Sequence, residues 1–241
     1  MTDHMAIHGS GAARQLNRGM LFWGVVGLIA QIAFMAGWLI AETWQGSGYS
    51  PIKYTISDLQ AATAPHVWFP IVCFALGGLG TFGFAVFGLR PALAKAQKIA
   101  VHSTWMLAFS TLALGNSFPL IPFRLMDPGA TAHAQLFSPG GLTDAIVSTF
   151  AFLMLVFTPA QLWKRFAVLP EWRRLKPMMR AASVICPICF LLLCASSLIG
   201  SFQGLAERIL VTSCVLWTCA LAINLISVSG KSQSSTSGTE L

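Results

Sequence analysis

The stretch Met20-Leu-Phe-Trp-Gly-Val-Val-Gly-Leu-Ile-Ala-Gln-Ile-Ala-Phe-Met-Ala-Gly-Trp-Leu-Ile-Ala41 decides the fold, because it carries no charged side chain. About 20 apolar residues in a helix rise roughly 30 Å, which is the thickness of the hydrocarbon core of a bilayer. Five more charge-free stretches of similar length follow it: Val67–Leu89, Ser103–Phe123, Ala145–Trp163, Ala181–Ala206 and Ile209–Gly230. The sequence therefore predicts an all-α, polytopic membrane protein that is a bundle of six transmembrane helices.

The composition leaves room for one membrane domain and two short tails. Of the 241 residues 55% are hydrophobic and 10% are charged, whereas soluble domains have about 25% charged residues. We expect a membrane domain at residues 20–230 between disordered cytoplasmic tails at 1–19 and 231–241, which are polar or rich in small residues. The six spans are expected at about 20–42, 67–89, 102–123, 142–163, 181–203 and 206–229.

The positions of the basic residues predict the orientation in the membrane. Twelve of the fifteen Lys and Arg residues fall in the two tails and in the loops after the second and fourth spans. Cytoplasmic loops carry an excess of Lys and Arg, so both termini are expected in the cytoplasm. The net charge of +7 is then a consequence of topology, and no nucleic-acid partner is expected.

The loop between the first two spans holds the most specific local pattern. Both tyrosines of the chain, Tyr49 and Tyr54, lie in it. Ser57 followed three residues later by Gln60 has the spacing of a capping box, so a short helix is expected to start at Asp58. The apolar residues between these polar ones would hold the segment against the bundle. We interpret the segment 49–60 as a lid or rim at the outer mouth.

These features resemble a known family. The chain resembles domain-of-unknown-function family 998 in four places. They are Tyr49-Ser50-Pro51, Ile56-Ser57-Asp58-Leu59, Phe118-Pro119 and Gly204-Leu-Ala-Glu207-Arg208. The resemblance covers about residues 20–229. It implies a six-helix membrane protein of the inner (plasma) membrane of bacteria or archaea, without an established activity. The family is distantly similar to eukaryotic membrane proteins that act on or around lipids, which is an analogy.

The candidate site lies at the outer ends of the helices, where most acidic residues gather. Asp58, Asp144 and Glu207 are the candidates for acid–base catalysis. Lys53, Arg124 and Arg208 could hold an anionic lipid headgroup, so membrane lipids are the expected partners. The residues expected to bind a substrate are Tyr49, Ser50, Ser57, Asp58, Arg124 and Arg208.

Other kinds of site find less support in the sequence. Outside the N-terminal tail no HxxxH spacing occurs, and HExxH and GxSxG are absent, so neither a metal nor a serine-hydrolase elbow is expected. Phosphate loops are absent, and the glycines in Gly77-Gly78-Leu-Gly80 lie within a predicted span with no strand before it, so they are not read as a dinucleotide fingerprint and no cofactor is predicted. Cys186-Pro-Ile-Cys189 has redox-motif spacing, but it lies inside a span without a charge beside it, and two apolar packing residues are the simpler interpretation.

Three functions stay open at this point. The first is recognition or modification of a lipid or another amphiphile by an outward-facing pocket. The second is transport of a small solute, which the charge-free centres of the spans do not favour. The third is a non-catalytic scaffold whose small-residue ridge Gly77, Thr81 and Ala85 would face the lipid. Gln31, Asn116 and Asn224 inside the spans are expected to serve as interhelical contacts.

Overall fold

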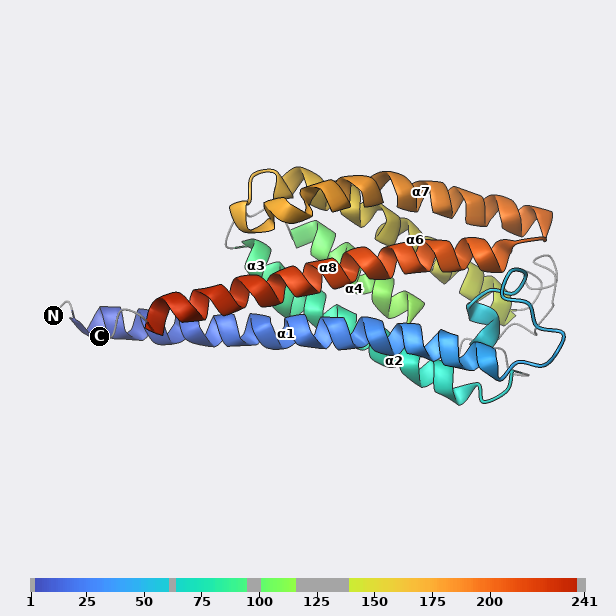
Figure 1. Ribbon diagram of the computed structural model, residues 1–241, viewed down its shortest axis with the longest axis horizontal. Helices are drawn as coiled ribbons and strands as arrows, with labels where there is room; N and C mark the ends of the chain where they lie inside the picture. Colours follow the sequence, from blue (N-terminus) through green and yellow to red (C-terminus); the bar gives the residue numbers. More distant parts are fainter. Residues whose placement is uncertain (1–2, 61–63, 95–100, 116–138, 238–241) are drawn as a thin grey trace.

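The computed structural model describes residues 3–60, 64–94, 101–115 and 139–237, and within these ranges its regular structure is helical (Figure 1). Its elements are α1 (Asp3–Thr43), η1 (Ser57–Gln60), α2 (Trp68–Gly83), η2 (Phe84–Leu89), α3 (Arg90–Ala94), α4 (Val101–Leu114), α6 (Pro139–Phe166), η3 (Pro170–Leu175), α7 (Lys176–Ile199) and α8 (Gln203–Ser237). The all-α prediction is confirmed.

The long helices form a closed ring in the order of the sequence. Helix α1 packs against α2, α2 against α4, α4 against α6, α6 against α7, α7 against α8, and α8 returns to α1. This neighbour order is that of an up-and-down bundle. A closed ring leaves an interior that side chains from several helices share, and that interior is where a site inside the membrane would lie.

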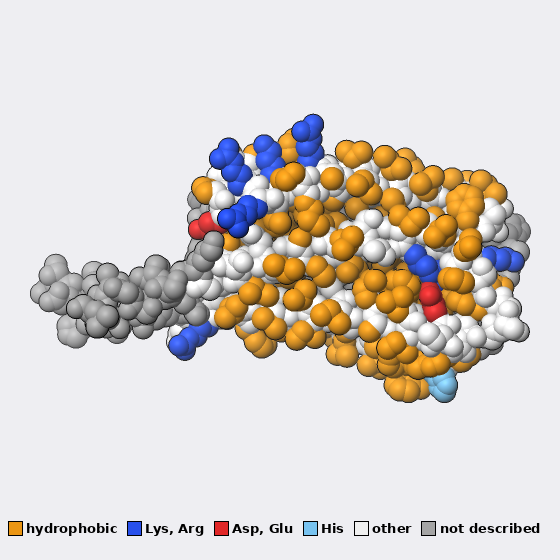
Figure 2. All heavy atoms as spheres, viewed as in Figure 1, with side chains coloured by type: hydrophobic (Ala, Val, Ile, Leu, Met, Phe, Trp, Pro, Cys, Tyr) orange, Lys and Arg blue, Asp and Glu red, His pale blue; other side chains and the backbone are white. Residues whose placement is uncertain are grey.

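Five helices among the described residues are long and apolar enough to cross a membrane. They are Gln15–Thr43, Trp68–Ala94, Asp144–Phe166, Pro170–Ile199 and Gln203–Gly230. The predicted third span begins with α4, and its second half, residues 116–123, lies outside the described residues. Large apolar side chains stay exposed on the outside of the bundle, such as Leu198 at 90% and Leu191 at 66%, and much of the visible surface is hydrophobic (Figure 2). The chain is a multi-pass helical membrane protein.

The described parts of the two tails, residues 3–19 and 231–237, are helical, where the sequence predicted disorder. Helix α1 extends back to Asp3 and α8 extends forward to Ser237. A helix that the membrane has already nucleated can lengthen without a new nucleation cost. The run Ala12-Ala13-Arg14-Gln15-Leu16 consists of good helix formers, which explains the extension at the N-terminus.

The two ends of the bundle differ in charge. One end, called the basic end below, carries η3 and most of the Lys and Arg side chains that Figure 2 shows. The other end, called the loop end below, carries the segment 44–60 between α1 and α2 and the start of α8 (Figure 1). Trp172 of η3 is buried and stacks on Phe166 at 5.2 Å, so the basic segment is anchored to the bundle by an aromatic pair.

Small residues bring α1 and α2 close together. A Cβ atom on Gly77 would lie 2.9 Å from Phe34, and one on Gly80 would lie 2.7 Å from Ala30. At the same contact Gln31 Nε2 donates to Thr81 Oγ1 at 2.7 Å. Gln31 is therefore an interhelical contact, as its position in the span suggested. The expectation that Gly77, Thr81 and Ala85 face the lipid is wrong, because all three are buried between helices.

Candidate functional site at the loop end

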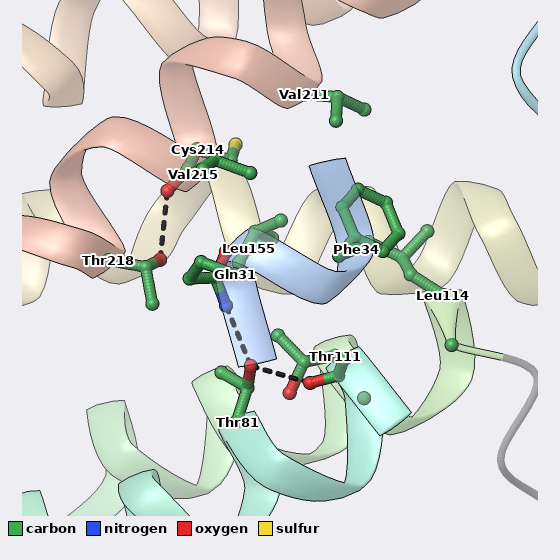
Figure 3. A pocket seen from close by; sticks show the side chains of 13 residues that line it. Gln31, Phe34, Thr81, Thr111, Leu114, Leu155, Val211, Cys214, Val215 and Thr218 are labelled. Atoms are coloured by element: carbon green, nitrogen blue, oxygen red, sulfur yellow. Dashed lines mark hydrogen bonds between the residues drawn. The ribbon is translucent and has the colours of Figure 1, made fainter. Parts of the chain in front are cut away.

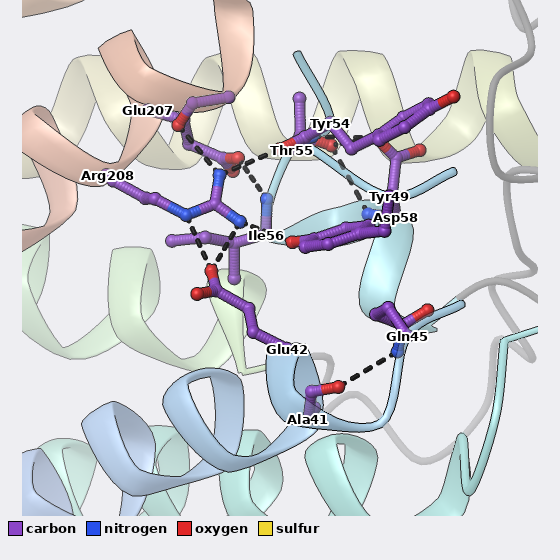
Figure 4. Close-up of polar contacts among 11 residues, drawn as sticks. Ala41, Glu42, Gln45, Tyr49, Tyr54, Thr55, Ile56, Asp58, Glu207 and Arg208 are labelled. Carbon is purple, nitrogen blue, oxygen red and sulfur yellow. Dashed lines mark hydrogen bonds and ion pairs between the residues drawn. The ribbon is translucent and has the colours of Figure 1, made fainter. Parts of the chain in front are cut away.

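Arg208, in the first turns of α8, is the centre of a buried polar cluster (Figure 4). Its Nε donates to Glu42 Oε1 at 2.6 Å, and its Nη2 forms an ion pair with the same oxygen. Nη2 also donates to the Tyr49 hydroxyl at 2.6 Å. Nη1 donates to the carbonyl oxygens of Tyr54 at 2.7 Å and Gly204 at 2.9 Å. These contacts engage the five N–H donors of the guanidinium.

The ion pair connects the first and the last helix of the chain. Glu42 is at the end of α1 and Arg208 is near the start of α8, and their side chains are only 19% and 10% exposed. The guanidinium also lies 5.7 Å from the centre of the Trp38 ring, one turn before Glu42. A pair that is this buried and this fully hydrogen-bonded holds a single geometry, so it sets the position of the loop that it contacts.

A second set of contacts fixes the loop against the start of α8. The backbone N–H of Ile56 donates to Glu207 Oε2, and the N–H of Leu205 donates to the carbonyl of Ile52 at 3.0 Å. Gly204 is needed here because a Cβ atom would lie 2.1 Å from the Tyr54 carbonyl oxygen. The loop is therefore a rim that is built into the bundle.

The predicted short helix is present as η1, but its capping pair differs from the prediction. The N–H and the hydroxyl of Thr55 donate to Asp58 Oδ2 at 2.7 and 3.0 Å, and the N–H of Asp58 donates to Thr55 Oγ1 at 3.2 Å. This is the reciprocal geometry of a capping box. Thr55 and Asp58 have the same three-residue spacing as Ser57 and Gln60, so the spacing alone could not choose between the two pairs.

Burial changes the acidity of two groups in the rim. Asp58 is 3% exposed, and burial raises the pKa of its carboxyl although the Thr55 hydrogen bonds act in the opposite direction. Burial also raises the pKa of the Tyr49 phenol, in spite of the nearby Arg208 charge. Asp58 Oδ1 is buried and has no hydrogen-bond partner among the described residues. It is therefore an acceptor that a donor group could use.

Most of the site residues predicted from sequence that can be placed lie in or beside this cluster. Tyr49, Asp58, Glu207 and Arg208 belong to it, and Asp144 on α6 interacts electrostatically with Asp58 and Glu207. The carbonyl of Ser50 accepts hydrogen bonds within the loop, and Ser57 starts η1. Arg124 lies outside the described residues. Among those described, no group of three His, Cys, Asp and Glu side chains is arranged to hold a metal ion.

The site list from sequence missed three contributors. Glu42 neutralises Arg208, Trp38 covers it, and Thr55 caps Asp58. The signal for Glu42 was its place at the loop end of the first span, level with the opposite charge that opens the last span. The signal for Thr55 was its spacing to Asp58. Neither signal shows that Glu42 pairs with Arg208, because that pairing depends on the order of the helices in the ring.

A cavity of about 40 Å³ lies inside the bundle (Figure 3). Helices α1, α2, α4, α6 and α8 all contribute to it. It begins one helical turn below the cluster, since Val211 lines it and follows Glu207 by four residues. The residues that line it are Gln31, Phe34, Gly77, Gly78, Thr81, Thr111, Leu114, Gly115, Leu155, Val211, Cys214, Val215 and Thr218.

The half of the bundle toward the basic end is packed with large apolar side chains. Phe84, Leu89, Leu162, Trp217 and Leu221 have no exposed surface. Buried polar side chains lie in the same half, such as Ser103, Thr104 and Ser229. Well-packed protein interiors contain few voids larger than a water molecule.

The fold and the buried cluster define a multi-pass helical membrane protein whose first and last helices are joined by an ion pair under a structured loop. The comparison with family models makes the assignment more specific: residues 28–224 match the model of the protein of unknown function family DUF998. The chain belongs to this family. No curated protein and no solved structure matches it.

Proposed function

We propose that the loop end faces the outer side of a prokaryotic inner membrane and binds the polar head of an amphiphile, using the rim and the carboxylates beneath it. The support for this orientation is the concentration of basic residues at the opposite end. Labelling of single cysteines with a membrane-impermeant maleimide tests it. Ser47→Cys should react in intact cells and Lys176→Cys should react only after lysis, with the parent protein as the background; the reverse pattern would refute the orientation.

The observation that carries the proposal is the buried carboxyl oxygen Asp58 Oδ1, which has no hydrogen-bond partner among the described residues. Glu42 pairs with the Arg208 guanidinium, and the carboxyl groups of Asp58 and Glu207 interact with it electrostatically. Arg208 uses its five donors within the protein, so it has none for an anionic headgroup, and we assign it as a positioning residue. The unpartnered Asp58 Oδ1 favours a head that donates hydrogen bonds, such as a primary ammonium group.

Binding of lipids that differ only in the head tests this function. We expect native mass spectrometry of the purified protein to retain phosphatidylethanolamine in preference to phosphatidylglycerol with the same acyl chains. Asp58→Asn removes a charge-assisted hydrogen bond, which is worth about 1.5–3 kcal/mol, so retention should weaken by about tenfold or more. Glu171→Gln, an exposed carboxylate at the basic end, is the matched control. Equal retention of both lipids would refute the proposal.

A second function, transport of a small solute, is supported by the cavity at mid-depth. A path from the loop end would have to continue past Leu89 and Leu221, which are completely buried in the half of the bundle toward the basic end. Transport would therefore need a second arrangement of the helices. Uptake of a labelled solute by proteoliposomes that contain the protein, and not by empty ones, would place this function first.

A further inference from the structure

We propose that the cavity inside the bundle is a binding site for a small hydrogen-bond donor, with a short primary ammonium ion as its fitting ligand. This site is separate from the rim, and the inference does not depend on the amphiphile proposal. It follows from three features of the cavity: the state of the hydroxyl groups that line it, its size, and the charges near it.

The hydroxyl groups of the lining present acceptors. Thr111 Oγ1 donates its proton to the carbonyl of Leu107 at 2.8 Å, and Thr218 Oγ1 donates to the carbonyl of Cys214 at 2.8 Å. Thr81 Oγ1 donates to Gly77 and accepts from Gln31 (Figure 3). A hydroxyl that gives its proton to its own helix keeps its oxygen lone pairs for another donor.

Among the described residues the lining therefore has few donors for a ligand. The side-chain amide of Gln31 uses one N–H for Thr81 and has a second N–H that could donate to a ligand. The amide oxygen of Gln31 adds another acceptor. Acceptors from α1, α4 and α8 thus converge on one space that is otherwise apolar. A ligand with several N–H groups and no acceptor is complementary to this arrangement, whereas a ligand rich in acceptors would leave lone pairs facing one another.

The size of the cavity and the nearby charge restrict the ligand further. A water molecule needs about 10–15 Å³ of such volume, so about 40 Å³ accepts a molecule of two or three heavy atoms. Glu207 lies one helical turn before Val211 on the same helix, toward the loop end. The Arg208 charge at the loop end is paired with Glu42, so it does not oppose a cation in the cavity. Methylammonium has the right size, charge and donor count.

Binding of labelled methylammonium to the purified protein by equilibrium dialysis tests the inference. The double variant Thr111→Val/Thr218→Val keeps the volume of both side chains and removes two acceptors. We expect it to weaken binding by tenfold or more. Thr158→Val is the matched control, because Thr158 is also buried and donates to the carbonyl four residues earlier, at 2.8 Å, but does not line the cavity.

Further ligands and one more variant separate this site from nonspecific effects. Tetramethylammonium has the same charge but no donor and five heavy atoms, so it should not bind on either ground, and Thr218→Ser should keep binding close to that of the unchanged protein. Absence of methylammonium binding, with the cavity holding water alone, would overturn the proposal. Binding that the double variant leaves unchanged, while its melting temperature shows that it is folded, would overturn it as well. None of these outcomes depends on whether phosphatidylethanolamine binds at the rim.

Discussion

Replacement of Arg208 by lysine is the sharpest test of the cluster, because it keeps the charge and changes only the geometry. The guanidinium makes five contacts with Glu42, Tyr49, Tyr54 and Gly204. A lysine ammonium has three donors on a single atom, so at least two of these contacts must be lost. The loop would then lose part of its connection to α8.

The expected cost follows from the contacts that are removed. Hydrogen bonds to charged groups contribute about 1.5–3 kcal/mol each, and the side chains of this pair are not completely buried, so we expect a loss of about 2–4 kcal/mol for Arg208→Lys. Arg208→Met should cost more, about 3–5 kcal/mol, because Glu42 keeps its charge without a partner. Adding Glu42→Gln to Arg208→Met should recover part of the loss, since the unpaired charge is then removed.

Thermal unfolding of the purified protein measures these differences. For a chain of this size 1 kcal/mol shifts the melting temperature by about 2–4 °C, so Arg208→Lys should melt roughly 5–15 °C lower. Arg174→Lys, at an exposed position of the basic end, is the control and should melt as the unchanged protein does. The reasoning fails if Arg208→Lys matches Arg174→Lys, or if the double variant is no more stable than Arg208→Met.

Three further predictions concern neighbouring parts of the molecule. Because burial raises the pKa of Asp58, the stability that this group contributes is complete below the ordinary carboxyl pKa of about 3.9 and is lost as the pH rises through the pKa of the folded state. The melting temperature should therefore decrease less between pH 4 and pH 8 for Asp58→Asn than for the unchanged protein. Gly204→Ala places a Cβ atom 2.1 Å from a loop carbonyl and should cost about 1–3 kcal/mol in thermal unfolding, whereas Gly230→Ala, with open space around it, should not destabilise. Gln31→Leu removes the hydrogen bond to Thr81 and should cost about 0.6–1.7 kcal/mol; an unchanged melting temperature would show that this contact does not hold α1 to α2.

The candidate site was only partly accessible from the sequence. Glu207 and Arg208 could be chosen because each is a charge at the end of an apolar span, where charges are rare enough to stand out, and Asp58 because it lies in the patterned loop segment 49–60. The role of Arg208 could not be predicted, because an arginine at this depth can pair with a lipid phosphate as well as with the carboxylate of Glu42. Local spacing likewise predicted the short helix η1 and left open whether Ser57 or Thr55 would cap it.

The sequence by itself determined that this chain crosses a membrane several times as helices, because twenty consecutive apolar residues satisfy the backbone inside a bilayer only in that form. It also determined where charges gather, since hydropathy and charge are properties of each residue in order. Only the tertiary structure decided that α8 returns to α1, which places Glu42 against Arg208. The cavity depends on the same closure, because its acceptors come from helices that are far apart in the chain and meet only when the ring is complete.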